Sequence, residues 1–200
     1  MPSFLFDYFW PAAAVWSLLY ISDYALTMIC ARLYRAQDTI VFEGSYELNP
    51  LFQRDVDSLR VVSPRFVFTL LLILGLLAFL WRLNEQSPAP ELWQFVLGCL
   101  IIVQLAVHMR HVRNLFLFRS IKNTDLIRGR IAYARTLAFR ISSVEWFAFS
   151  GLFLILFAFT QSWFILGGAT ACFFLGANRR RLARRSTTKV AGATQSPEET

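Results

Sequence analysis

Charged side chains are scarce in this 200-residue sequence, at 16% of the total, whereas apolar residues make up 56%. Soluble chains carry about a quarter charged residues, so an ordinary soluble domain is excluded. Catalytic triads, Walker loops, dinucleotide fingerprints and His-Glu-x-x-His are also lacking. The three cysteines lie in apolar runs at no metal-like spacing, which indicates small hydrophobic residues in a reduced setting.

Long apolar runs dominate what is present. A helix needs about twenty residues to cross the roughly 30 Å hydrocarbon layer, and five runs meet or approach that length. The sequence therefore predicts an all-α, polytopic transmembrane helical bundle in one domain (residues 1–178), with spans at about 10–31, 64–81, 91–109, 144–159 and 162–177. The last two form a predicted hairpin, because one merged span would be too long for a bilayer without extreme tilt.

Basic residues are confined to alternate connections between these runs. Nineteen of the twenty lie in Arg32–Arg65, Arg110–Arg140 and Arg179–Lys189. The positive-inside rule then predicts five spans with the N-terminus outside and the C-terminus in the cytoplasm. The net charge of +7 is thus explained by basic segments that set the orientation in the membrane and contact anionic lipid headgroups. Nucleic-acid binding is not expected.

Two features complete this topology. Eighteen Arg against two Lys are typical of a GC-rich bacterial genome, so we expect a multi-pass protein of a bacterial inner membrane. Residues 179–200 combine a polybasic block with an aperiodic polar segment, which predicts a disordered cytoplasmic tail.

The connection between the first two spans contains a predicted interfacial helix. Asn49 and Pro50 are suited to its N-cap and first position, and it would run to about Arg60. An amphipathic helix of this kind lies on a membrane surface. Its predicted apolar face consists of Leu51, Phe52, Val56 and Leu59.

Asp23 lies near the middle of the first predicted span, on one helical stripe with Tyr20, Thr27 and Cys30. A carboxylate at that depth is costly unless it is protonated, paired or hydrated. We therefore expect this face to turn into the bundle. Asp23 is then either a structural carboxylate that fixes helix packing or part of a functional site.

The only two histidines lie on the third span, where Gln104, His108 and His111 fall at i, i+4 and i+7. Histidines three residues apart on a helix are neighbours, and imidazole is a common metal ligand. The alternative is that both rings face headgroups at the cytoplasmic end of the span.

Further acidic residues lie on the same predicted side of the membrane, at Glu43, Glu47 and Glu145. Glu47 has a simpler interpretation too, because negative charge is favourable near a helix N-terminus. Taken together, these positions predict one vestibule that opens to the cytoplasm, with Asp23 at its floor. The candidate catalytic residues are Asp23, Glu47 and His108; a divalent metal ion would be held by these three and His111; the other vestibule residues are Tyr20, Thr27, Glu43, Asn49, Gln104 and Glu145.

The order of Asp23, Thr27 and then Glu47-x-Asn49-Pro50-Leu51 resembles a group of small prokaryotic membrane proteins. In that group an Asp-x(2–3)-Thr element is followed by Glu-x-Asn-Pro. The resemblance covers the first third of the chain. It implies that these residues form one site, and it implies no reaction.

Three functional classes remain open on this reasoning. The chain is a scaffold or accessory subunit of a membrane complex, a membrane-embedded and metal-dependent enzyme for a lipid-like substrate, or a small ion or proton channel or carrier. A homo-oligomer is compatible with each of them, and a channel of five helices requires one. Metal content after purification is the measurement that best separates the enzyme from the others.

Overall fold

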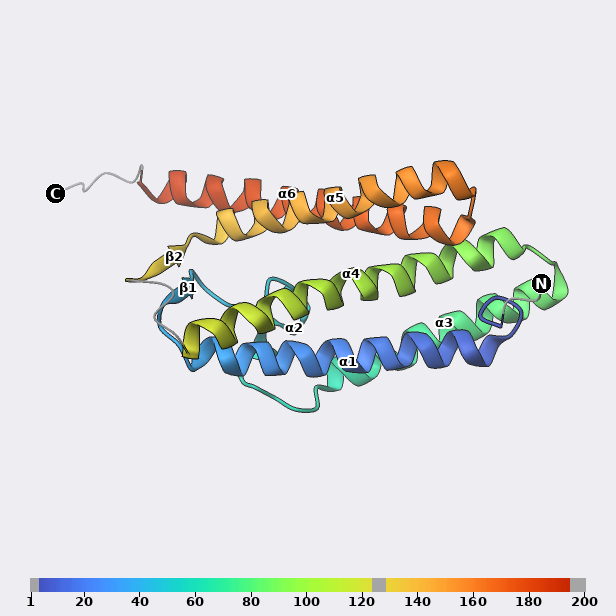
Figure 1. The fold of residues 1–200 in the computed structure, drawn as a ribbon, viewed down its shortest axis with the longest axis horizontal. Coiled ribbons are helices and arrows are strands. Elements are labelled where there is room, and N and C mark those ends of the chain that lie inside the picture. Colours follow the sequence, from blue (N-terminus) through green and yellow to red (C-terminus); the bar gives the residue numbers. More distant parts are fainter. Residues whose placement is uncertain (1–3, 124–128, 195–200) are drawn as a thin grey trace.

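The computed structural model describes residues 4–123 and 129–194. Within them the chain forms six helices and, at one end, one pair of short strands; the long helices α1, α3, α4, α5 and α6 run roughly along one axis (Figure 1). The elements are α1 (Phe9–Arg35), β1 (Ile40–Phe42), α2 (Pro50–Asp57), α3 (Pro64–Gln86), α4 (Pro90–Asn123), β2 (Ile131–Tyr133), α5 (Arg135–Thr160) and α6 (Trp163–Thr194). We call the end of the bundle that carries β1 and β2 the strand end.

Four of the described helices, α1, α3, α4 and α5, are long and apolar enough to cross a membrane. This confirms the predicted all-α bundle of membrane-spanning helices. The fifth predicted span, in α6, is not among the four. Its apolar part covers only residues 163–177 before the arginines begin, and fifteen residues rise roughly 22 Å, which is less than the hydrocarbon thickness.

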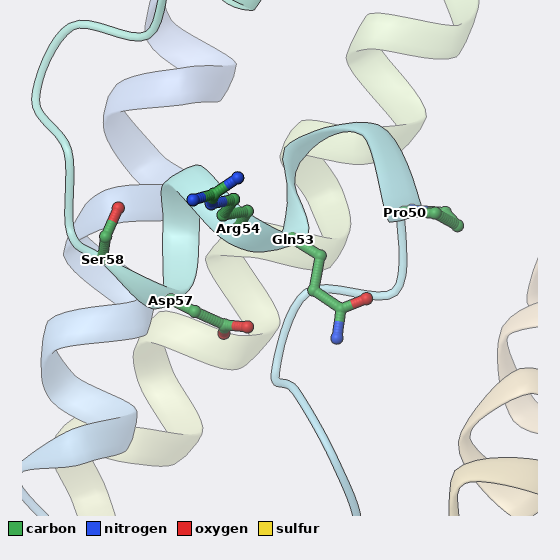
Figure 2. Close-up of a pocket in the computed structure, with 5 residues that line it drawn as sticks. All are labelled: Pro50, Gln53, Arg54, Asp57 and Ser58. Atoms are coloured by element: carbon green, nitrogen blue, oxygen red, sulfur yellow. The ribbon is translucent and has the colours of Figure 1, made fainter.

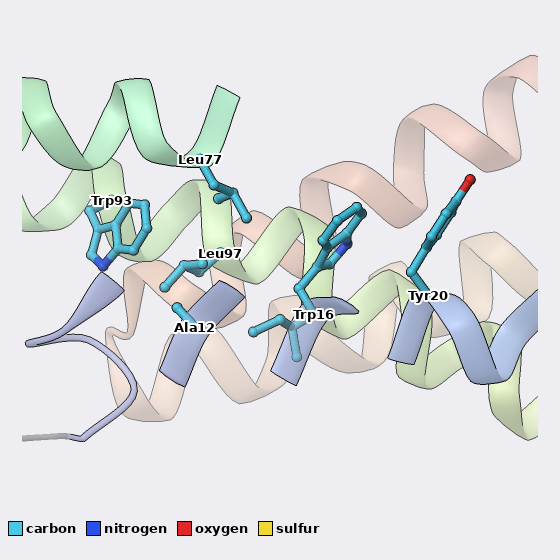
Figure 3. Packing of buried hydrophobic residues seen from close by; sticks show 7 residues of the cluster. Ala12, Trp16, Tyr20, Leu77, Trp93 and Leu97 are labelled. Carbon is cyan, nitrogen blue, oxygen red and sulfur yellow. The ribbon is translucent and has the colours of Figure 1, made fainter. Parts of the chain in front are cut away.

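The helices pack through aromatic and small side chains. Away from the strand end, Trp16 and Tyr20 of α1 stack at 5.2 Å between ring centroids, and Trp93 of α4 donates a hydrogen bond to the carbonyl of Phe6. Lipid tails are as apolar as leucine, so van der Waals fit drives this association. The cluster contains Ala12, Trp16, Tyr20, Leu77, Trp93, Leu97 and Ile101 (Figure 3).

Two glycines allow α4 and α6 to approach closely. A Cβ atom at Gly98 would lie 1.8 Å from the carbonyl oxygen of Phe164, and one at Gly167 would lie 1.9 Å from that of Phe95. Any larger residue at either position would force the helices apart. The contact holds α6 against α4 along its apolar part.

The short helix α2 begins as predicted. The Asn49 side chain accepts a hydrogen bond from the Leu51 backbone N–H at 3.2 Å, and Pro50 is the first helical residue. Val56 is buried against α1, whereas Leu51 is 67% exposed. The predicted apolar face is therefore only partly covered by protein.

Helices α4 and α5 continue beyond the predicted spans into the arginine-rich segment, and α6 continues to Thr194. Residues 179–194, which were predicted to be a disordered tail, are thus part of α6; residues 195–200 lie outside the described residues. The reason is local, because arginine, leucine and alanine are strong helix formers, and Ala183 is also buried.

The strand pair was not predicted. β1 and β2 are parallel, with Ile40 opposite Ile131 and Phe42 opposite Tyr133. They connect the segment after α1 to the segment before α5. Three residues with no clear alternation give no periodicity from which a strand could be recognised.

Candidate functional site

A cavity of about 540 Å³ lies inside the bundle and extends towards the strand end. Its walls come from α1, α4, α5 and α6, with the segment from β1 to α2 closing one side. Eight of the ten predicted vestibule residues line it: Tyr20, Asp23, Thr27, Glu47, Asn49, Gln104, His111 and Glu145.

The other two predicted residues lie elsewhere. The His108 Nε2 atom is 2.7 Å from the Ser22 hydroxyl, and its Nδ1 donates to the Gln104 carbonyl oxygen at 2.6 Å. Glu43 is exposed and accepts a hydrogen bond from the backbone N–H of Arg135. Neither side chain lines the cavity, so the prediction that His108 shares a site with Asp23 and Glu47 is wrong. Three helical residues correspond to about 300° of rotation, which directs the two imidazoles to different neighbours.

Asp23 and His111 form the central polar contact of the cavity. Asp23 Oδ1 accepts a hydrogen bond from His111 Nε2 at 2.7 Å, and Thr27 Oγ1 lies 3.2 Å from the same nitrogen. The Cys30 thiol donates to the His111 backbone carbonyl at 3.7 Å. The stripe predicted on α1 thus faces inwards, and its carboxylate is paired across to α4.

A second polar group links α4 to α5. Glu145 forms ion pairs with Arg110, at 3.0 Å, and with Arg113. Arg110 also donates to the Ser142 hydroxyl, and its guanidinium lies 5.3 Å from the centre of the Trp146 ring. Glu145 was predicted to lie in the vestibule, but the two arginines were not. From sequence alone, the arginine-rich segments indicate only the orientation of the chain in the membrane.

Glu47 and Arg179 lie in the wall formed by the loop before α2 and by α6. Glu47 Oε1 accepts a hydrogen bond from the Asn49 backbone N–H at 2.6 Å, and Arg179 donates to the carbonyl of Leu48 at 2.5 Å. Burial raises the pKa of Glu47, although the Asn49 N–H and the nearby Arg179 act in the opposite direction. Arg179 is a functional candidate that the sequence analysis assigned to a disordered tail.

Aromatic residues close the cavity towards the strand end. Phe42 and Tyr133, which are opposite each other in the strand pair, stack at 5.4 Å. Tyr46 packs on Phe118 and accepts a hydrogen bond from Asn114 at 3.2 Å. The four aromatic residues and Asn114 all line the cavity. Nothing in their sequence pattern distinguishes the four from ordinary interfacial aromatic residues.

Buried polar atoms without hydrogen-bond partners concentrate at this cavity. In the described part of the chain there are six such side-chain atoms, and all six belong to residues that line it. Two of them, Arg110 Nε and Glu145 Oε2, form an ion pair with each other. Two others belong to residues with a polar side chain nearby: Tyr20 lies beside Thr69, and His111 lies beside Cys30.

Gln104 Oε1 and Trp146 Nε1 remain without a protein partner. Native proteins leave few buried polar groups unpaired, and each one requires an explanation. One of these atoms accepts hydrogen bonds and the other donates them. The residues that line the cavity therefore include one buried acceptor and one buried donor with no hydrogen-bond partner among the described residues.

The predicted metal ligands are not brought together. Within residues 4–123 and 129–194, no group of three or more His, Cys, Asp or Glu side chains is arranged to hold a metal ion. His108 contacts Ser22, and the His111 Nε2 atom is engaged by Asp23. The divalent metal predicted for Asp23, Glu47, His108 and His111 does not fit this geometry.

A shallow pocket of about 440 Å³ lies on the outer face of α2, where Pro50, Gln53, Arg54, Asp57 and Ser58 line it (Figure 2). It contains none of the predicted site residues.

Comparisons with protein-family models, curated proteins and solved structures find no match to this chain. The fold and the cavity therefore define its class, a helical membrane-type bundle with a polar cavity at one end.

Proposed function

We propose that this chain is a five-span membrane protein whose cavity binds a small amphipathic molecule from the cytoplasmic side. The five spans place the N-terminus outside and the C-terminus in the cytoplasm. The alternation of basic segments supports this orientation. The close packing of α6 on α4 through Gly98 and Gly167 supports the fifth span, because a helix buried against protein needs less apolar length than one surrounded by lipid.

The observation that carries the proposal is the concentration of unpartnered buried polar atoms at one cavity. In a scaffold, polar groups pair with one another to fix helix packing, as Asp23 and His111 do. Gln104 and Trp146 have no such partner. The cavity has the size of typical small-molecule sites, and its lining combines many apolar side chains with a few polar groups.

A binding experiment on the purified protein in a neutral detergent tests the proposal. We expect 1-lauroylglycerol 3-phosphate and monolauroylglycerol to bind at one site by isothermal titration calorimetry. Ala138→Phe adds a ring to a cavity-lining position of α5 and should abolish both signals. The matched control is Gly151→Phe on the same helix, where an added Cβ meets nothing within 4 Å.

Binding that is equal in the two variants, or absent from the unmodified protein, would overturn the proposal. If Ala138→Phe does not yield a monodisperse protein, Val107→Trp fills the same cavity from α4. Either variant alone tests the proposal, because the proposal requires only that filling the cavity abolishes binding.

A second candidate function, an enzyme that moves a proton on the bound molecule, is favoured by the Asp23–His111 contact. A carboxylate that accepts from one imidazole nitrogen holds the ring in one orientation and stabilises its protonated form. Uptake of deuterium by the bound amphiphile in heavy water, followed by mass spectrometry, tests this candidate. Carbon-bound deuterium should be taken up with the unmodified protein and not with His111→Gln, whereas His108→Gln serves as the control.

A further inference from the structure

The three arginines that line the cavity differ in whether a carboxylate pairs with their positive charge. Arg110 and Arg113 share the carboxylate of Glu145. Arg179, in contrast, has no carboxylate within ion-pair distance among the described residues. Its guanidinium donates to the Leu48 carbonyl, yet it carries five N–H groups. Most of its hydrogen-bonding capacity is therefore open to an occupant of the cavity.

None of the three acidic side chains that line the cavity forms an ion pair with Arg179. Asp23 is paired with His111, and Glu145 with the other two arginines. Glu47 is the remaining acid of the cavity lining. The Glu47 carboxylate accepts a hydrogen bond from the Asn49 backbone N–H and forms no ion pair with Arg179 among the described residues. The Arg179 guanidinium therefore lines the cavity with no carboxylate bound to it.

Other parts of the lining are apolar and large enough for more than a headgroup. The volume of about 540 Å³ corresponds to about eighteen water volumes of roughly 30 Å³ each. Apolar side chains of α4, α5 and α6 contribute to the wall: Val103, Val107, Leu117, Ile141 and Leu175. A bare inorganic anion would leave this wall without contacts.

We propose that the cavity takes a single-chain amphiphile with an anionic phosphate or carboxylate headgroup, and that Arg179 binds this headgroup. A guanidinium fork matches the oxygens of either anion through paired charge-assisted hydrogen bonds. Ester or hydroxyl oxygens between the headgroup and the chain pair with Trp146 and Gln104, whose buried polar atoms have no protein partner. This inference rests on the proposed function and specifies the chemistry of its ligand.

Three matched probes separate the parts of this proposal: 1-lauroylglycerol 3-phosphate, monolauroylglycerol without the phosphate, and glycerol 3-phosphate without the chain. Calorimetry on the full chain in a neutral detergent should show the first binding roughly tenfold to a hundredfold more tightly than the second, the range expected for a charge-assisted contact. Glycerol 3-phosphate should bind far more weakly than the first.

Arg179→Gln should remove the preference for the phosphate, and Arg179→Lys should retain most of it. The control is Arg181→Gln, two residues further along α6 at an exposed position outside the cavity lining. If Arg179→Gln is not obtained folded, the contrast between Arg179→Lys and the unmodified protein, together with the three probes, still measures the preference.

Equal affinity for the charged and neutral lipids, or an unchanged preference in Arg179→Gln, would overturn the inference while leaving the cavity a binding site. If glycerol 3-phosphate binds as tightly as 1-lauroylglycerol 3-phosphate, the site takes a free anion, and the proposal of an amphiphilic ligand is overturned. Absence of binding by all three probes would instead count against the proposed function itself.

Discussion

Asp23 Oδ1 and His111 Nε2 are 2.7 Å apart, although 88 residues separate them along the chain. The contact joins α1 to α4 inside the wall of the cavity. A carboxylate in the middle of an apolar helix is costly when it is alone, so α1 gains stability only in the position where α4 presents the imidazole. The hydrogen bond thus fixes the register of two helices and also places two ionisable groups in the cavity wall.

Asp23→Asn separates these two roles, because it keeps the shape of the side chain and removes the charge. We expect a loss of about 1.5–3 kcal/mol in the free energy of unfolding, the range for a hydrogen bond to a charged group. Thermal unfolding in detergent and calorimetry with 1-lauroylglycerol 3-phosphate provide the two measurements. Affinity for this anionic lipid should rise, because the variant removes a negative charge from the cavity lining. A fall in stability with unchanged binding would assign Asp23 a structural role alone.

Gly167→Leu should prevent assembly of the bundle. The first atom of the new side chain would lie 1.9 Å from the Phe95 carbonyl oxygen, and backbone at a helix contact cannot move away at low cost. Size-exclusion chromatography should show aggregated protein or none. Gly151→Leu, in an open position of α5, should elute as the unmodified protein does; a normal elution profile for both variants would contradict the packing of α6 on α4.

The proposed orientation is open to cysteine labelling in a background where the three native cysteines are alanine. Ser87→Cys, at the exposed end of α3, should react with a membrane-impermeant maleimide in intact cells. Arg181→Cys should react only after the membrane is permeabilised. Labelling in the reverse order would exclude a cytoplasmic cavity mouth, and labelling of both in intact cells would exclude five spans.

Glu47 should make stability depend on pH. Burial raises its pKa in the folded state, so the folded protein binds a proton that the unfolded chain has already released. Stability from this group is complete below the ordinary pKa of glutamic acid and is lost as the pH rises through the raised value. The melting temperature of the unmodified protein should therefore fall relative to that of Glu47→Gln across this interval. Glu43→Gln, at an exposed position, should follow the unmodified protein.

The sequence contained enough information for the helices and for half of the site. Apolar runs and the Asn49 cap predicted where helices begin, because these signals act over a few residues. The inward stripe of Asp23 and Thr27 was also predictable, since a buried carboxylate must find a partner.

The choice of partner was not predictable. His108 and His111 lie on neighbouring parts of one helical face, and the rotation of α4 against α1 decides which of them meets Asp23. That rotation depends on side-chain packing across the whole contact, including Gly98 on the opposite face against α6. Arg179 was missed for a similar reason: whether an arginine after an apolar run faces solvent or a cavity depends on the direction of α6.

The parallel strand pair has a consequence for the order in which the protein folds. Ile40 and Ile131 are far apart in sequence, and the three pairs that they begin are too few to be stable alone in water. Loop closure over such a distance costs entropy that three pairs cannot offset, so the ladder forms only once α1, α4 and α5 have already brought its strands together. Because Phe42 and Tyr133 belong to both the ladder and the cavity lining, the strand end of the cavity is completed after its helical walls.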